Sequence, residues 1–175
     1  DQRGSVVPVS GTLVDLLSDP VRDRFYILRQ DSNELLVFDG SSQTQIAKFK
    51  TASKPTQMAV TFDRRYLLVG HAFAQLIKVY DLETLEESTP VRMPGGHYPH
   101  SIGVSSKAIL AACRSVGPEN KMVRIDFPTR TGSVLPSLGV YDNKIDVNTI
   151  LVGSPNGSSI MAAQADGNLL LYSAN

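Results

Sequence analysis

The sequence contains no tryptophan, one cysteine and no surplus of charge. Its 17 basic and 17 acidic residues cancel, whereas proteins that bind phosphate groups usually carry a basic excess. We therefore expect neither nucleic acid nor an anionic membrane as a partner. The single cysteine, Cys113, has no second cysteine with which to form a disulfide. It lies in the apolar run AILAACRS, which predicts a buried hydrophobic residue.

Long apolar runs are also missing. No stretch approaches the roughly 18 to 20 apolar residues that a membrane-spanning helix requires, so no membrane insertion is expected. The first residues, DQRGSVVPVSG, lack the basic and then apolar order of a secretion signal. The chain also begins without methionine, and we expect its 175 residues to be one domain of a longer protein.

The sequence does contain a repeat of about 45 residues. Four segments each consist of three short apolar runs separated by polar turns. In three of them the last run ends on aspartate, at Asp39, Asp81 and Asp126, which are 42 and 45 residues apart. Pro55 and Pro99 are 44 residues apart at a common position of the repeat. Repeats of this length are typical of propellers and other repeat architectures.

The apolar runs predict strands rather than helices. FYILRQ, YLLVGH, LLVFD and LIKVYD are short and rich in β-branched and aromatic residues. A weaker fourth strand is predicted after each third run, in TQIAKFK, ESTPVRM and GSVLPSL. Pro90 and Pro136 in these fourth strands favour the outer edge of a sheet, because proline cannot donate a ladder hydrogen bond. The sequence thus predicts an all-β propeller or partial propeller of about four blades, each with four antiparallel strands.

We expect a single propeller-type domain over residues 1–175. Its fourth blade lacks an outer strand, and residues 4–10 resemble one, with Pro8 at the position of Pro90 and Pro136. This segment either closes a four-bladed ring or ends an upstream blade of a larger propeller. The second alternative is favoured, and its open blade edges would allow self-association with another copy. The predicted blades cover residues 12–50, 57–93, 101–138 and 148–175.

The repeats resemble the YVTN-type β-propeller repeats of bacterial surface-layer and lactonase-like proteins. The closest match is KPTQMAVTFDRRYLLVGHAFAQLIKVYDLET, and DPVRDRFYILRQDSNELLVFDGSSQT comes next. Both contain an aspartate turn, a tyrosine in the second strand and a third strand that ends on aspartate. The third and fourth segments lack this tyrosine. The resemblance implies a propeller fold and an extracellular or periplasmic location, but no particular activity, because propellers host many functions.

The candidate site is GGHYPHS, residues 95–101, which holds two of the three histidines. Its alignment with TASKPTQ predicts a connection from one outer strand to the next inner strand, on the loop face where propellers often bind ligands. His97, Tyr98 and His100 are the candidate ligand contacts there, although a structural or merely solvated role is the favoured interpretation of the two histidines. Two imidazoles without a nearby carboxylate or cysteine do not make a zinc site. No metal, cofactor or catalytic residue is therefore predicted, and His71 is expected to point elsewhere.

Two kinds of charged residue recur with the repeat. An aspartate that ends each third strand predicts a turn closed by backbone N–H groups. Basic pairs lie in the same turn of two repeats, beside aspartates that cancel their charge, which favours solvated hairpin tips over an anion site. These residues are Asp39, Asp81 and Asp126, and the pairs Arg22/Arg24 and Arg64/Arg65.

The function favoured by the sequence is a non-catalytic binding or scaffold module of a bacterial surface or secreted protein, with a protein or glycan ligand. The alternative is a lactonase-like hydrolytic propeller, since GGHYPHS faintly resembles the Gly-x-Gly-Pro-Arg-His loop of such enzymes. Pro99 matches that loop, but His100 replaces its arginine and Ser101 its histidine. Hydrolysis also requires acid or base groups near the centre. The predicted inner strands VDLL, QMAVTF, SIGV and TILVG offer almost none.

Overall fold

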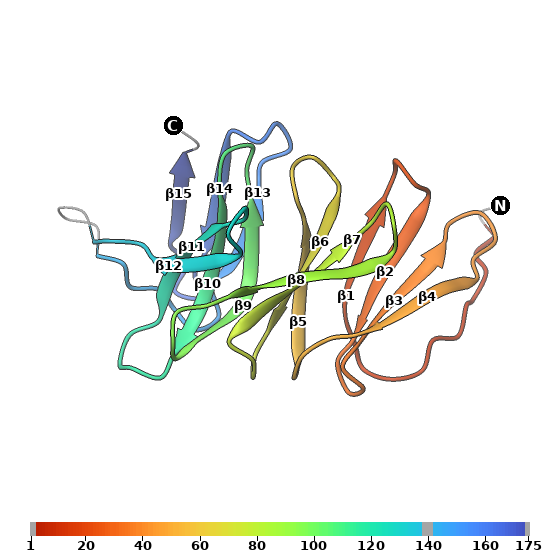
Figure 1. The fold of residues 1–175 in the computed structure, drawn as a ribbon, viewed down its shortest axis with the longest axis horizontal. Helices are drawn as coiled ribbons and strands as arrows, with labels where there is room; N and C mark the ends of the chain where they lie inside the picture. The colour runs from red at the N-terminus through yellow and green to blue at the C-terminus, as the bar shows by residue number, and fades with distance from the viewer. Residues whose placement is uncertain (1–2, 138–141, 174–175) are drawn as a thin grey trace.

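The strands form an array that extends from the N-terminal to the C-terminal end of the molecule (Figure 1). A computed structural model describes residues 3–137 and 142–173, which contain fifteen strands and no helix. The predicted all-β class is therefore confirmed. Since these residues form no helix, none of them belongs to a helix that could cross a membrane.

Consecutive strands pair antiparallel and form four units. Unit 1 contains β1 (Leu13–Asp19), β2 (Arg24–Arg29), β3 (Glu34–Asp39) and β4 (Gln45–Lys50). Unit 2 contains β5 (Pro55–Val60), β6 (Tyr66–His71), β7 (Leu76–Asp81) and β8 (Glu86–Arg92). Unit 3 contains β9 (His97–Val104), β10 (Ile109–Ser115), β11 (Lys121–Asp126) and β12 (Thr131–Val134). Unit 4 contains β13 (Ile150–Gly153), β14 (Ser159–Ala163) and β15 (Leu169–Ser173).

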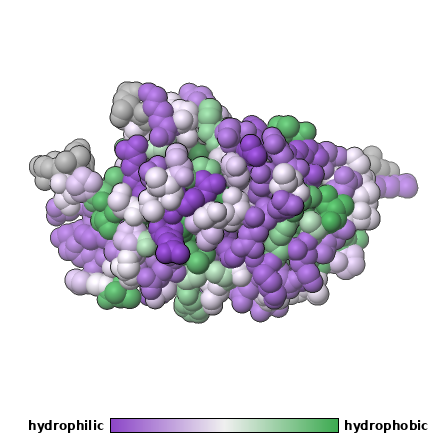
Figure 2. Space-filling view, viewed as in Figure 1, coloured by the Kyte–Doolittle hydropathy of each residue, from purple (hydrophilic) through white to green (hydrophobic). Residues whose placement is uncertain are grey.

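Units 2 and 3 are joined at their last strands. Arg92 of β8 pairs parallel with Thr131 of β12, which merges the two units into one eight-stranded sheet. Figure 1 shows β8 and β12 running across the front of the molecule. Most hydrophobic side chains on this surface are separated by hydrophilic ones (Figure 2).

Three apolar layers hold neighbouring units together. Side chains alternate between the two faces of a strand, so Leu67 and Val69 pack towards unit 1 whereas Leu68 packs towards unit 3. The same alternation places Ala111 and Cys113 in the layer shared with unit 2, and Leu110 and Ala112 in the layer shared with unit 4. Both faces of units 2 and 3 are therefore buried.

A repeated side-chain hydrogen bond also joins the first strands of neighbouring units. In each case one side chain accepts the backbone N–H of the next unit's first strand, so each unit fixes the register of its neighbour. The pairs are Met58 N to Asp15 Oδ2 at 2.8 Å, Ile102 N to Gln57 Oε1 at 2.6 Å and Leu151 N to Ser101 Oγ at 2.9 Å.

Each of the first three units has a register shift just before this acceptor. The shifts lie between Leu13 and Asp15, between Pro55 and Gln57, and opposite the Ala112–Cys113 step of β10. The extra residue in these β-bulges is Val14, Thr56 or His100. A bulge re-aims a side chain, and here the hydroxyl of Thr56 donates to the carbonyl oxygen of His100 at 2.7 Å.

Several strand boundaries differ from the predicted ones. Strand β9 begins at His97, whereas the third blade was predicted to begin at residue 101. Strand β12 ends at Val134, so the prediction that Pro136 lies inside an outer strand was wrong. Pro90 does lie in the last strand of its unit, as predicted.

The N-terminal segment forms no strand within residues 3–10. It is held along unit 1, where Ser5 donates to the side-chain oxygen of Gln43 at 3.1 Å and Arg29 donates to the carbonyl of Ser10 at 3.1 Å. Figure 1 shows it on the side of unit 1 that is remote from unit 2, at the opposite end of the array from unit 4. The outer strand predicted at residues 4–10 is therefore not formed within this chain.

Candidate functional site

The GGHYPHS stretch is mostly strand rather than connection. His97, Tyr98 and His100 all lie in the first half of β9, and only Gly95 and Gly96 precede it. The prediction that these side chains belong to a loop was wrong, because β9 extends past the bulge to pair with the end of β10. The strand nevertheless brings them to the edge of the molecule at which the first strands of units 2 and 4, β5 and β13, also begin.

Tyr98 and Arg114 form a half-buried cation–π pair in this region. They are cross-strand partners, and the guanidinium lies over the tyrosine ring at 4.2 Å from its centre. Arg114 also donates to the carbonyl of Ala72 at 3.0 Å, which links unit 3 to unit 2. The Gln75 amide donates to the hydroxyl of Tyr98 at 3.2 Å. Both side chains are thus held in place by partners outside their own unit.

His100 is largely a linking residue between units 3 and 4. Its Nε2 lies 3.0 Å from the carbonyl oxygen of Thr149, so this nitrogen carries the proton and donates it. The other ring nitrogen, Nδ1, is buried and has no hydrogen-bond partner among the described residues. Burial lowers the pKa of His100, against the opposite effect of the Thr149 carbonyl. The imidazole is therefore neutral at pH 7.

A cavity of about 270 Å³ opens beside these residues. It lies where the first strands of units 2, 3 and 4 begin, and its lining includes one cationic side chain and no carboxylate. The residues that line it are Thr56, Ala72, Tyr98, His100, Arg114, Val147 and Asn148.

The surface around the cavity also combines a cationic side chain with aromatic and apolar ones. The Lys54 ammonium lies over the Phe73 ring at 4.6 Å from its centre. Phe73 directly follows Ala72, whose carbonyl accepts a hydrogen bond from Arg114. Val116, next to the end of β10, is 73% exposed. Its backbone N–H donates to Gly96 beside His97 and Tyr98. We call Lys54, Phe73, Tyr98, Arg114 and Val116 the aromatic–cation patch.

His97 lies at the edge of this region, and its Nδ1 is 3.1 Å from the carbonyl of Gly95. His71 is fully buried at the end of β6, between the backbone of Ala52 and that of Leu76. The three imidazoles therefore do not share a site, and no metal-binding cluster occurs within residues 3–137 and 142–173. Cys113 is buried, as predicted, and burial raises the pKa of its thiol.

At the opposite end of the first strands, a buried carboxylate already has hydrogen-bond partners. A cavity of about 370 Å³ there includes Asp19, Phe62 and Ser154. The Asp19 carboxylate accepts from the hydroxyl of Tyr26 at 2.7 Å and from Arg22 at 3.0 Å. Burial alone would raise the pKa of Asp19, but these donors outweigh it and lower the pKa. This carboxylate is an ionised structural acceptor.

The basic turns also serve structure. Arg22 donates to the carbonyl of Arg64 at 2.8 Å and Arg24 to that of Leu82 at 2.8 Å, so both side chains join unit 1 to unit 2. Arg65 pairs with Asp81 at 3.2 Å. The prediction of freely solvated hairpin tips was wrong for Arg22 and Arg24, because the neighbouring unit offers carbonyl oxygens to them.

Of the aromatic–cation patch, the sequence predicted Tyr98 but not Lys54, Phe73, Val116 or Arg114. The Arg114 side chain reaches the site only because the bulge at His100 brings Tyr98 opposite Arg114. The sequence signal that could have found it is the end of the apolar run AILAAC, after which Arg114 is the first polar residue before a turn.

Solved structures of similar fold exist at low sequence identity. The chain is similar to Kuenenia stuttgartiensis hydrazine synthase, with a TM-score of 0.70 and 18% identity over 85% of this chain and 42% of that chain. It is similar to a chain of the mitotic checkpoint complex, with a TM-score of 0.72 and 16% identity over 97% and 51%. It is also similar to the Myceliophteria thermophila Swd1 (Cps50) β-propeller domain, with a TM-score of 0.69 and 18% identity over 95% and 55%.

These likenesses show the fold alone, a β-propeller arrangement. The chain spans about half the length of the three structures. No family model matches the sequence, and no curated protein matches it. The chain is therefore an all-β protein of the propeller fold.

Proposed function

We propose that the chain is a non-catalytic propeller module whose four units are its blades, and that it binds a protein ligand through the aromatic–cation patch. The observation that carries the proposal is the pair of Tyr98 and Arg114, held rigidly beside a cavity. Tyrosine and arginine are among the side chains most enriched in residues that dominate protein interfaces. Their fixed positions reduce the entropy lost on binding.

The charge of the patch favours an acidic partner. Lys54 and Arg114 each lie over an aromatic ring, and the cavity that Arg114 lines includes no carboxylate. We therefore propose a peptide segment that carries Asp or Glu next to an aliphatic residue. The carboxylate would meet the guanidinium, and the aliphatic side chain would enter the cavity beside Tyr98.

The engagement of the central polar groups supports a binding role over a hydrolytic one. His100 and Ser101 stand where the lactonase-type loop has its arginine and histidine, and each of them bonds unit 4. Asp19 is held by Tyr26 and Arg22. These side chains serve the packing of the units, whereas an acid–base mechanism needs groups that are free to exchange protons with a substrate.

The test is binding of fluorescent Asp/Glu-rich peptides with aliphatic residues, measured by anisotropy. The wild-type chain is expected to bind one class of these peptides, and Tyr98→Ala and Arg114→Ala are each expected to weaken binding at least tenfold. Lys107→Ala, which removes an exposed cation at the opposite end of the strands, is the matched control and should leave the affinity unchanged. Binding of oligosaccharides but not peptides would assign the patch to a glycan instead.

A further inference from the structure

Unit 4 has an uncovered apolar face. In the strand register Val152, Met161 and Leu171 lie side by side, and Ile150, Ala163 and Leu169 form the adjacent row. Four of these side chains are more than 60% exposed: Ile150, Val152, Leu169 and Leu171. Contiguous apolar surface of this kind marks an interaction site in soluble proteins.

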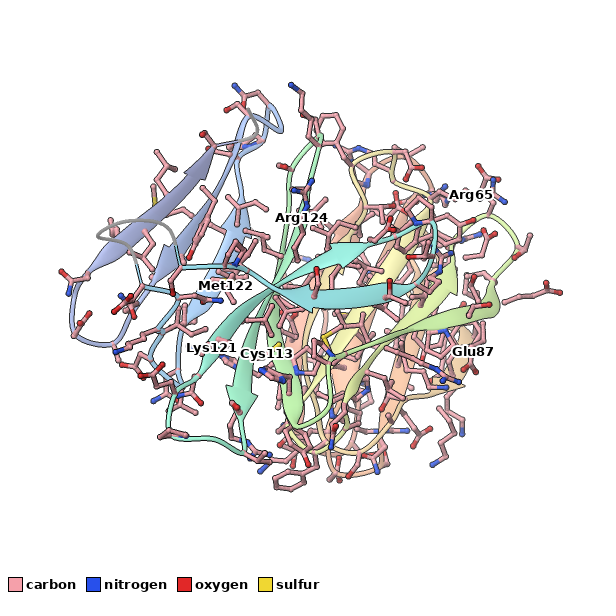
Figure 3. The ribbon with its side chains drawn as sticks, turned by 60° about the vertical axis from the view of Figure 1, so that its left-hand side comes forward. Arg65, Glu87, Cys113, Lys121, Met122 and Arg124 are labelled. Carbon is pink, nitrogen blue, oxygen red and sulfur yellow. The ribbon has the colours of Figure 1, made fainter. Side chains whose placement is uncertain are left out.

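The other units show what covers the corresponding face. In unit 3 this face contains Leu110, Ala112 and Met122, and all three are buried in the layer shared with unit 4. Figure 3 shows Met122 on the side of unit 3 that faces β13–β15. In unit 2 the corresponding face contains Leu68 and packs against unit 3. The occupant in each case is the opposite face of another unit.

That opposite face is partly exposed at the other end of the array. In unit 1, the register places Leu16 beside Ile27 and Leu36, and Phe25 beside Phe38. Leu16 is 65% exposed and Phe25 is 41% exposed, whereas Leu36 and Phe38 are buried on this side, along which residues 3–10 lie. Each internal layer packs the face of one unit that points towards unit 4 against the face of the next unit that points towards unit 1. At the ends of the molecule, unit 4 leaves a face of the first kind uncovered and unit 1 leaves a face of the second kind partly exposed. The exposed part of the unit 1 face is therefore of the kind that unit 4 lacks.

We propose that two copies of this chain associate head to tail, with unit 1 of each packed on unit 4 of the other. Interfaces of this type generate closed rings when the rotation between copies permits. The chain spans only 42% to 55% of three structures of similar fold, so two copies supply the length of one such chain. The resulting ring contains eight units.

The same arrangement gives unit 4 a fourth strand. Residues 4–10 precede β1 in the chain as β4 precedes β5 and β8 precedes β9. In the two-copy ring this segment of one copy lies next to the outer edge of β15 in the other. There it leaves its hydrogen bonds along unit 1 and supplies the fourth strand, which pairs the backbone groups of the edge.

The first experiment is the solution mass of the full chain by size-exclusion chromatography with light scattering. The proposal predicts about 38 kDa, twice the 19.0 kDa of one chain. Leu171→Lys, which buries a charge in the contact, is expected to give the monomer mass. The control Val134→Lys alters an exposed apolar residue of β12, away from both end faces, and should remain dimeric. A wild-type monomer at every concentration, or a Leu171→Lys dimer, would overturn the proposal.

A second experiment tests the head-to-tail geometry. Leu16→Cys and Leu171→Cys lie at opposite ends of one chain, but they meet across the proposed contact. Under mild oxidation the double variant is expected to form a covalent dimer, whereas each single variant should not. A covalent dimer of Leu171→Cys alone would mean that two unit 4 faces pack on each other, and it would refute the head-to-tail ring. Circular dichroism confirms that each variant retains its β-sheet content.

Discussion

Units 3 and 4 are built from the same kind of antiparallel sheet, yet one is covered on both faces and the other on one. In β10 of unit 3, Leu110, Ala111, Ala112 and Cys113 are all buried. In β14 of unit 4, Ile160 and Ala162 are buried, but Met161 between them is 39% exposed. The difference is in the neighbours, because unit 3 lies between two units and unit 4 has only one.

The comparison teaches that the sequence of a strand reflects the environment in which the strand functions. Strand β15 reads LLLYS, a continuous apolar run typical of a strand buried on both faces. In this chain its side chains alternate between exposed and half-buried. The sequence of unit 4 therefore fits a unit with a partner on each side, as in units 2 and 3.

The largest expected effect on stability comes from a comparison of two leucines of unit 4, one on its covered face and one on its uncovered face. Leu151 is 2% exposed and packs against unit 3, whereas Leu171 points away from it. Leu151→Ala is expected to lower the free energy of unfolding by about 2–5 kcal/mol, because it leaves a cavity in a packed layer. Leu171→Ala is expected to change it by less than about 0.5 kcal/mol.

Both values refer to urea unfolding at protein concentrations where the chain is monomeric. At concentrations where two copies associate, the Leu171→Ala cost should rise, because stability is then linked to association. Equal costs for the two variants under monomeric conditions would mean that unit 4 is covered within a single chain, and the distinction between units 3 and 4 would fail.

The fold could be predicted from sequence signals that depend on residues close together in the chain and not on the neighbouring units. The aspartates at the ends of third strands predicted turns, and this is confirmed for Asp39, which accepts the Ser42 N–H at 2.7 Å, and for Asp81, which accepts the Glu83 N–H at 2.9 Å. At Asp126 the donor is instead the hydroxyl of Thr129. Such turns are made within a few residues, so the spacing of the sequence is enough to predict them.

The site could be predicted only in part, because it depends on register and on contacts between units. The sequence indicated Tyr98 and His100, but the bulge that turns His100 towards unit 4 has no sequence signal of its own. The partner of Tyr98, Arg114, lies on another strand, and its second contact is in unit 2. Both relations are set by long-range pairing, which a single sequence does not encode locally.

A second prediction concerns the pH dependence of the free energy of unfolding and the buried imidazole of His71. Burial lowers the pKa of His71 from its ordinary 6.5 to about 4, although the Leu76 carbonyl acts in the opposite direction. Between these values the unfolded chain binds a proton and the folded chain does not. The free energy of unfolding should therefore fall as the pH drops from about 6.5 to about 4, by about 3 kcal/mol.

The measurement is urea unfolding at several pH values, with His71→Gln as the comparison. The glutamine variant loses stability at neutral pH, but its stability should depend less on pH in this window because the titrating group is gone. A wild-type stability that is flat from pH 6.5 to pH 4 would show that His71 is not sealed between Ala52 and Leu76. Burial also lowers the pKa of His100, so a smaller dependence of the same sign should persist in the variant.

The smallest effect concerns the bond by which unit 3 holds unit 4. Ser101 is 3% exposed, and its hydroxyl oxygen accepts the backbone N–H of Leu151 at 2.9 Å. Ser101→Ala leaves that buried N–H without its acceptor and should lower the free energy of unfolding by about 1–3 kcal/mol. Ser133→Ala, at an exposed position of β12, is the matched control and should change it by less than about 0.5 kcal/mol. The same series of bonds stops at unit 4, where the apolar Ile150 stands at the position of Asp15, Gln57 and Ser101. If Ser101→Ala and Ser133→Ala proved equally mild, the apolar layer alone would position unit 4. The covered and uncovered units would then differ only in buried surface, and the hydrogen-bond series would contribute nothing to that difference.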